Sequence, residues 1–97
     1  MKEYLPIGTV VILSEGQKTI MIYGRKQLHA KTNMLYDYVA CLYPEGNIDE
    51  EYIYLFNHDQ IGEIVFTGYI NEEEEKFLAF IDKAYRTLIN NEGADDV

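Results

Sequence analysis

Three side chains of this sequence have the chemistry of a nucleophilic active site: the single cysteine, Cys41, and the two histidines, His29 and His58. A thiol activated by an imidazole base is a common arrangement for covalent catalysis. Cys41, however, lies between Ala40 and Leu42, and no glycine-rich turn surrounds it to expose the sulfur. A cysteine in such a run is usually a small buried hydrophobe. We therefore predict that the protein is not an enzyme.

The same side chains, together with Asp59, are the candidate ligands of a metal ion. Structural zinc sites use paired ligands at short spacing, and the sequence contains no such pair. The acidic residues 49–51 lack the alternating pattern of a calcium loop and are better interpreted as a solvated loop. Glycine-rich phosphate-binding motifs are also absent from the sequence. We expect no cofactor and no metal.

Length and composition predict one globular domain, residues 1–97. The chain has 97 residues, of which 47% are hydrophobic and 26% charged, so there is enough apolar surface for a core. No apolar window is long enough to span a bilayer, and the first residues lack the apolar region of a signal peptide. One cysteine cannot form an internal disulfide. The expected location is the cytoplasm.

The net charge of −9 is spread unevenly along the chain. Residues 1–44 carry a net charge of +2, whereas residues 45–97 carry −11. An acidic half repels phosphate backbones and anionic lipids, so we expect neither nucleic-acid nor membrane binding. The small basic group at positions 25, 26, 29 and 31 lacks interleaved aromatics and is best interpreted as a solvated hairpin loop.

The elements that position these residues are five short strands followed by one helix. Turn residues such as Gly16 and Gly46 separate the strands, and Gly62 is a candidate bulge. Because no crossover helices intervene, the sheet should be mainly antiparallel and should curl into an SH3-like barrel or roll. The predicted strands, within residues 8–69, are 8–13, 19–25, 34–43, 52–56 and 60–68.

The last quarter of the chain changes to a helical period, at about residues 71–90. Apolar residues from Phe77 to Leu88 form one stripe, which we expect to pack against an open side of the sheet. Asn71 is the predicted N-cap, with Glu74 as its capping-box partner. Asparagines and Gly93 should end the helix and leave a frayed tail at 91–97. The fold class is therefore α+β.

Tyrosine is over-represented: the chain has 9 tyrosines, 4 phenylalanines and no tryptophan. Tyrosine is enriched at protein interfaces, because its body is apolar and its tip is polar. The alternative is a small barrel that fills its partly wet core with tyrosine. The predicted partner-binding surface consists of Tyr36, Tyr38, Tyr43, Pro44, Glu45, Tyr52 and Tyr54.

Several ordered segments resemble a known family. Residues 4–11 read YLPIGTVV, residues 36–47 read YDYVACLYPEGN, residues 54–58 read YLFNH and residues 64–69 read IVFTGY. Together they resemble a family of small Gram-positive bacterial proteins described as a domain of unknown function. That family's pattern is YLPIGSVV, YDYxGCxYPEG, YLFNxxxI and VxFxGY. Thr9 and Ala40 depart from it, where serine and glycine are usual.

The resemblance implies a genomic neighbourhood and a binding role, and it implies no catalytic reaction. Genes of this family commonly lie beside the type VII secretion apparatus and its LXG-type antibacterial toxins. It implies a cytoplasmic chaperone or adaptor that binds the N-terminal or central segment of such a toxin before export. An alternative is an immunity protein that neutralises the toxin's catalytic domain. A further alternative is a homodimer formed through an exposed strand edge. The family supplies no catalytic residue.

Overall fold

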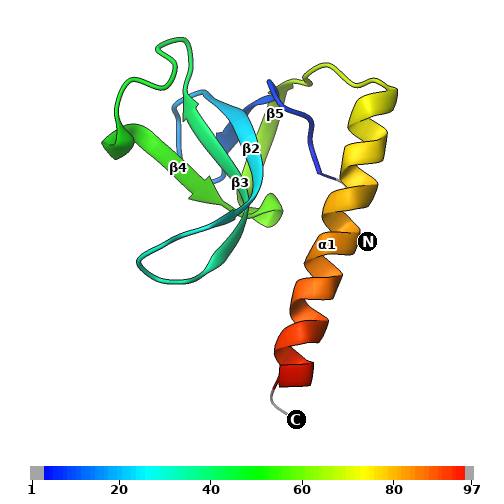
Figure 1. Ribbon diagram of the computed structural model, residues 1–97. Coiled ribbons are helices and arrows are strands. Elements are labelled where there is room, and N and C mark those ends of the chain that lie inside the picture. Colours follow the sequence, from blue (N-terminus) through cyan, green and yellow to red (C-terminus); the bar gives the residue numbers. More distant parts are fainter. Residues whose placement is uncertain (1–3, 96–97) are drawn as a thin grey trace.

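The computed structural model describes residues 4–95 and confirms an α+β fold, shown in Figure 1. All strand pairings are antiparallel, and the strand order is β4-β3-β2-β1-β5. Two 3₁₀ turns, η1 and η2, precede β4 and β5. The elements are β1 Val10–Leu13, β2 Ile20–Leu28, β3 Leu35–Leu42, η1 Glu50–Tyr52, β4 Ile53–Phe56, η2 His58–Gln60, β5 Ile61–Phe66 and α1 Glu72–Asp95.

The sheet is curled but not closed. Strands β4 and β5 lie at its two edges, yet only Asn57 and η2 separate them in the chain. A flat sheet would place its outer strands about 19 Å apart, at roughly 4.8 Å per strand. A linker that includes a 3₁₀ turn, with a rise of about 2 Å per residue, cannot cover that distance. The sheet therefore curls until the two edges approach, as expected for an SH3-like roll.

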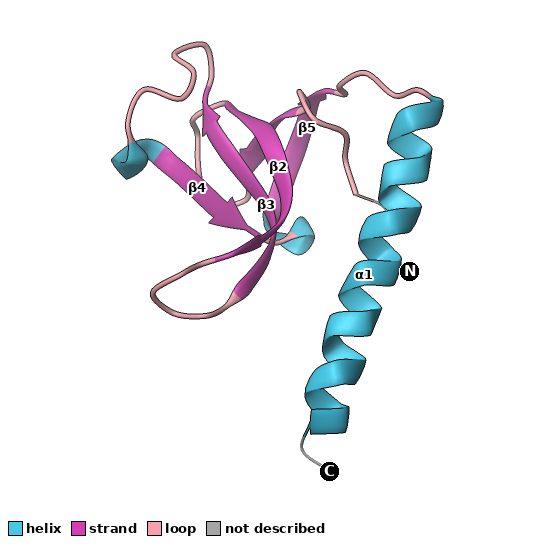
Figure 2. Ribbon diagram, in the orientation of Figure 1, coloured by secondary structure: helices cyan, strands magenta, loops and turns pink. Residues whose placement is uncertain are grey.

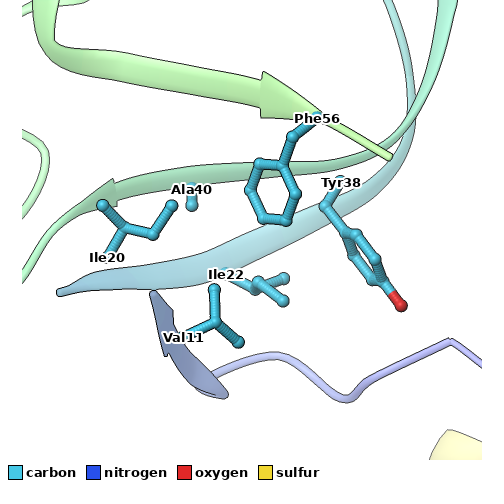
Figure 3. Packing of buried hydrophobic residues seen from close by; sticks show 6 residues of the cluster. All are labelled: Val11, Ile20, Ile22, Tyr38, Ala40 and Phe56. Atoms are coloured by element: carbon cyan, nitrogen blue, oxygen red, sulfur yellow. The ribbon is translucent and has the colours of Figure 1, made fainter. Parts of the chain in front are cut away.

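The inside of the curl holds the core, shown in Figure 3. Its members come from β1 to β4, and all are at most 2% exposed. The rings of Tyr38 and Phe56 lie 5.4 Å apart between their centroids. The edge strand β5 adds only the partly buried Ile61. The core cluster is Val11, Ile20, Ile22, Tyr38, Ala40 and Phe56.

Strand β5 pairs with β1 through two irregularities. Leu13 faces Ile61 and Ile12 faces Glu63, so Gly62 is the extra residue of a bulge, as predicted. A second shift lies between Val10 and Val11. Bulges increase local twist and end regular pairing, and they are frequent at sheet edges. β5 is therefore held to the sheet less regularly than an internal strand.

The helix departs from two predictions. α1 continues to Asp95, past the predicted end near residue 90, and Gly93 lies inside it. A glycine inside a helix costs about 1 kcal/mol relative to alanine, which weakens a helix without ending it. The last two residues of the predicted tail, 96–97, lie outside the described residues.

Contrary to our expectation, the described part of the apolar stripe of α1 does not cover the sheet. Phe77 is 49% exposed and Phe80 is 64% exposed, whereas Ile81 is 8% exposed. Figure 2 shows α1 standing to one side of the sheet. The prediction was wrong because the interior of the curl is already filled by side chains from the strands. The side chains of Tyr85 and Leu88 lie outside those that the structure describes.

Gly68 gives the first testable prediction. A Cβ placed there would lie 2.2 Å from the carbonyl oxygen of Ile7, and the Gly68 N–H donates to Thr9 Oγ1 at 3.0 Å. Because backbone cannot yield easily, Gly68→Ala should lower the free energy of unfolding by about 1–3 kcal/mol, the usual cost of overpacking. Gly16→Ala is the matched control, since its Cβ would lie 3.7 Å from the nearest atom. Equal urea midpoints for the two variants would contradict this account.

Candidate functional site

The predicted tyrosine surface divides into a buried part and an exposed part. Tyr38 is fully buried, so it is not a contact residue, and its inclusion in the surface is corrected. Its hydroxyl accepts a hydrogen bond from the Leu5 N–H at 3.0 Å and lies 2.7 Å from His58 Nδ1. Burial raises the pKa of Tyr38 to about 12. Tyr36 and Tyr54 are partly buried.

The remaining predicted residues lie at the surface. Tyr43 and Tyr52 are each 47% exposed, and Pro44 and Glu45 are exposed too. Glu45 accepts from Lys18 Nζ at 2.8 Å, and this hydrogen bond lowers the pKa of the Glu45 carboxyl. Tyr43, Pro44 and Glu45 lie in the turn after β3, whereas Tyr52 ends η1, directly before β4.

Tyr43 also lines an apolar groove of about 420 Å³ on the outer face of the sheet. Val10 pairs with Met21 on one side and with Phe66 on the other, so these three side chains point to the same face. Phe66 is 63% exposed. None of the described residues that line the groove is charged. They are Gly8, Val10, Thr19, Met21, Tyr43, Val65 and Phe66.

Such a groove is suited to receiving apolar side chains. Exposed apolar patches of this kind, bordered by polar surface, are typical of protein-interaction sites and ligand grooves. Aromatic residues and methionine, which line this one, are enriched where proteins meet. The geometry therefore favours binding as the role of this face.

A buried ion pair fixes the start of α1 beside this sheet. Arg25 is 8% exposed and forms a two-point contact with the Glu74 carboxylate, with the NH2–Oε1 distance at 2.8 Å. The guanidinium also donates to the Leu5 carbonyl at 3.2 Å and lies 5.5 Å from the centre of the Phe77 ring. The prediction of a solvated basic loop was wrong for Arg25, because its side chain is buried in this ion pair. It was also wrong for Lys26, because β2 continues to Leu28 and the Lys26 side chain is only 17% exposed.

A family model for a domain of unknown function, DUF4176, matches residues 4–77. The chain belongs to this family. The DUF4176 match contains all five strands and ends at Phe77, the ring that lies against Arg25. The groove and the Arg25–Glu74 pair thus both lie inside the family domain. No curated protein and no solved structure matches the chain.

The DUF4176 domain uses His58 and its neighbours to fasten η2 to β3. The His58 N–H donates to Asp37 Oδ2 at 2.8 Å, and the Asp37 N–H donates to Asn57 Oδ1 at 3.1 Å. Lys26 Nζ lies 3.8 Å from Asp37 Oδ1. The His58 ring packs 5.8 Å from that of Tyr38, between centroids. These contacts stabilise the turn between β4 and β5.

The cysteine and histidines are not brought together as a catalytic pair. Cys41 is 3% exposed and lies one residue from Ala40 in β3, so its side chain points to the face opposite the core. His58 packs on the core side against Tyr38. His29 Nδ1 accepts from the Thr32 N–H at 3.2 Å, inside the loop after β2.

Within the part of the DUF4176 chain that the structure describes, no group of three His, Cys, Asp or Glu side chains is arranged to hold a metal ion. Of the acidic residues 49–51, Asp49 caps η1, since its Oδ1 accepts from the Glu51 N–H at 3.0 Å.

None of the described helices has the length and apolarity needed to cross a membrane.

Sequence reasoning missed the groove residues contributed by β5. The sequence predicts a strand at residues 60–68, but the predicted tyrosine surface does not include its apolar run at 64–66. The available signal was that this run is continuously apolar instead of alternating. In an edge strand of an antiparallel sheet, such a run must expose apolar side chains on at least one face.

Proposed function

We propose that this DUF4176 protein is a non-enzymatic accessory factor that binds a protein partner through the groove. The observation that carries the proposal is the uncharged groove on the outer face, with Tyr43, Val65 and Phe66 each 47–63% exposed around it. A folded chain gains little from displaying such side chains to water. Covering them on binding removes apolar area from water and contributes about 25 cal/mol per Å².

The proposed partner is a type VII secreted toxin of the LXG class, bound through its N-terminal or central segment in the cytoplasm before export. The support is the resemblance, whose longest motif spans residues 36–47 and includes Tyr43. The family match adds that this motif lies within a recognised domain. The protein would then serve as a chaperone or adaptor.

A second candidate is an immunity protein that neutralises the toxin's catalytic domain. The net charge of −11 over residues 45–97 favours it where the toxin's catalytic surface is basic. The two candidates differ in the segment that they bind. An immunity protein should hold the C-terminal fragment and abolish toxicity, whereas a chaperone should bind elsewhere and leave the activity intact.

The test is co-expression with an LXG-class toxin, supplied as separate N-terminal, central and C-terminal fragments. Tyr43→Ala should weaken capture about tenfold or more, as expected for truncation of an interface aromatic. The domain should remain folded, because Tyr43 is 47% exposed.

Tyr52→Ala is the matched control, because Tyr52 is equally exposed but does not line the groove. Equal effects of the two substitutions would remove the groove as the binding site. Failure of the wild-type chain to capture any fragment would overturn the proposed partner.

A further inference from the structure

Strand β5 has one unused edge. It pairs with β1 on one side, and in the part of the chain that the structure describes no strand pairs with its other side. An unpaired edge presents a row of backbone N–H and C=O groups that can accept another strand. Proteins usually protect such edges with charges, prolines or a covering helix. On β5 the sequence provides one charge, Glu63.

Both faces of β5 carry exposed apolar side chains. Ile64 pairs with Val11, which is a core residue, so its side chain continues the inner face, yet it is 47% exposed. Phe66 pairs with Val10 on the outer face and is 63% exposed. Helix α1 does not cover this edge with its own apolar stripe, since Phe80 remains 64% exposed. The sheet thus ends on side chains that a further strand would bury.

The opposite edge of the sheet differs. In β4 the side chains of Ile53, Tyr54 and Leu55 are partly buried, and Phe56 is 1% exposed. In β5 every residue from Gly62 to Phe66 is exposed. The two edges therefore offer different surfaces to a strand, and β5 is the one on which new apolar contacts would form.

The charge around β5 indicates what the added strand should carry. Glu63 lies in the middle of β5, Asp59 precedes it, and Glu72 and Glu73 begin the helix that follows. All four are exposed. Opposite charges on neighbouring strands stabilise pairing, and like charges destabilise it. This edge is thus complementary to a basic segment and unfavourable to an acidic one.

We propose that β5 accepts, as a sixth strand, an extended, β-branched apolar segment of the partner that carries a lysine or arginine at the position beside Glu63. Its apolar side chains would lie beside Ile64 on one face and Phe66 on the other, with a cationic residue beside Glu63. Main-chain hydrogen bonds would supply affinity, and the groove beside Phe66 would supply side-chain selectivity. The inference rests on the proposed function and specifies how the partner is held.

A second copy of this chain fits the edge poorly. Pairing β5 with another β5 would bring together two Glu63-bearing strands of chains that each carry a net charge of −9. Electrostatics therefore favours a basic partner over self-association.

The first experiment uses a synthetic peptide of valine and threonine with a lysine at its centre, added to the full chain. Amide NMR shifts should be largest at residues 61–66. The same peptide with N-methylated alternate amides keeps its side chains but loses backbone donors, and it should bind at least about tenfold more weakly. Shifts centred elsewhere, or equal binding by both peptides, would overturn the inference.

The second experiment reverses the charge. Glu63→Lys should reduce binding of the lysine-bearing peptide and increase binding of its glutamate-bearing counterpart, each about tenfold. Glu50→Lys is the control, because it makes the same charge change on an exposed residue of η1, beside β4 at the opposite edge of the sheet. Equal responses to the two substitutions would indicate general charge attraction and would contradict the proposed strand.

The outcomes separate this inference from the proposed function. Capture of a toxin fragment without slowed hydrogen exchange at β5 amides would overturn the added strand and leave the accessory role intact. Peptide binding at β5 without capture of any toxin fragment would support the edge site and overturn the choice of partner.

Discussion

Replacing Arg25 with methionine is expected to lower the free energy of unfolding by about 3–5 kcal/mol, the usual cost of removing one member of a buried ion pair. The Arg25 and Glu74 side chains are 3% and 12% exposed. Without the guanidinium, the Glu74 carboxylate would lack its charge partner in a poorly hydrated site. The substitution also removes the donor to the Leu5 carbonyl and the cation above the Phe77 ring.

The double variant Arg25→Met, Glu74→Met tests the reason for that loss. Replacing both charges by apolar groups of similar size is often close to neutral, so the double variant should be more stable than Arg25→Met alone. Lys76→Met is the control, because the Lys76–Glu72 pair is 77% and 83% exposed and such pairs contribute at most about 1 kcal/mol. Urea unfolding measures all three. A double variant less stable than Arg25→Met would contradict the argument.

The position of the loss can be measured too. Arg25 joins β2 to the N-terminal segment and to α1, so its removal should release the helix before the sheet. Hydrogen exchange should therefore accelerate in the first turns of α1 more than in β3. Equal acceleration in both elements would show that the ion pair does not act at the helix.

Local patterns predicted the elements because the causes of those elements are local. Alternation and turn residues predicted five antiparallel strands, and the structure contains them. Asn71 was predicted as the N-cap, and its Oδ1 accepts from the Glu74 N–H at 3.0 Å. In each case the decisive contact joins residues close in sequence, or follows from the side-chain period.

The positions that sequence reasoning missed depend on distant contacts. Glu74 was expected to complete a capping box, but its carboxylate pairs with Arg25, which is 49 residues away in sequence. The amphipathic period of α1 shows which side chains share a stripe, but it cannot show whether a surface is available to cover that stripe. Similarly, the tyrosine excess did not distinguish the buried Tyr38 from the exposed Tyr43, because that depends on how the sheet curls.

Tyr38→Ala is expected to destabilise the protein by about 3–5 kcal/mol, the cost of emptying a large aromatic site in a core. Tyr38 is fully buried, and its ring packs against Phe56 and Tyr4 at centroid distances of 5.4 and 6.0 Å. Tyr38→Phe keeps the ring but leaves the Leu5 N–H and His58 Nδ1 without the hydroxyl, and should cost about 1–3 kcal/mol. Equal losses for the two variants would show that the ring contributes little.

The hydroxyl of Tyr38 should also control stability at alkaline pH. Burial raises its pKa to about 12 in the folded protein, from the ordinary value of 10.0. Because the folded pKa is the higher one, the fold favours the neutral phenol. The neutral phenol contributes fully to the free energy of unfolding below about pH 10. That contribution, on the order of 2 kcal/mol, is lost as the pH rises to about 12.

Tyr38→Phe cannot ionise, so the difference in free energy of unfolding between the wild type and Tyr38→Phe should shrink between about pH 10 and about pH 12. A Tyr38→Phe difference that stays constant to pH 12 would show that the phenol ionises equally easily in the folded and unfolded chains.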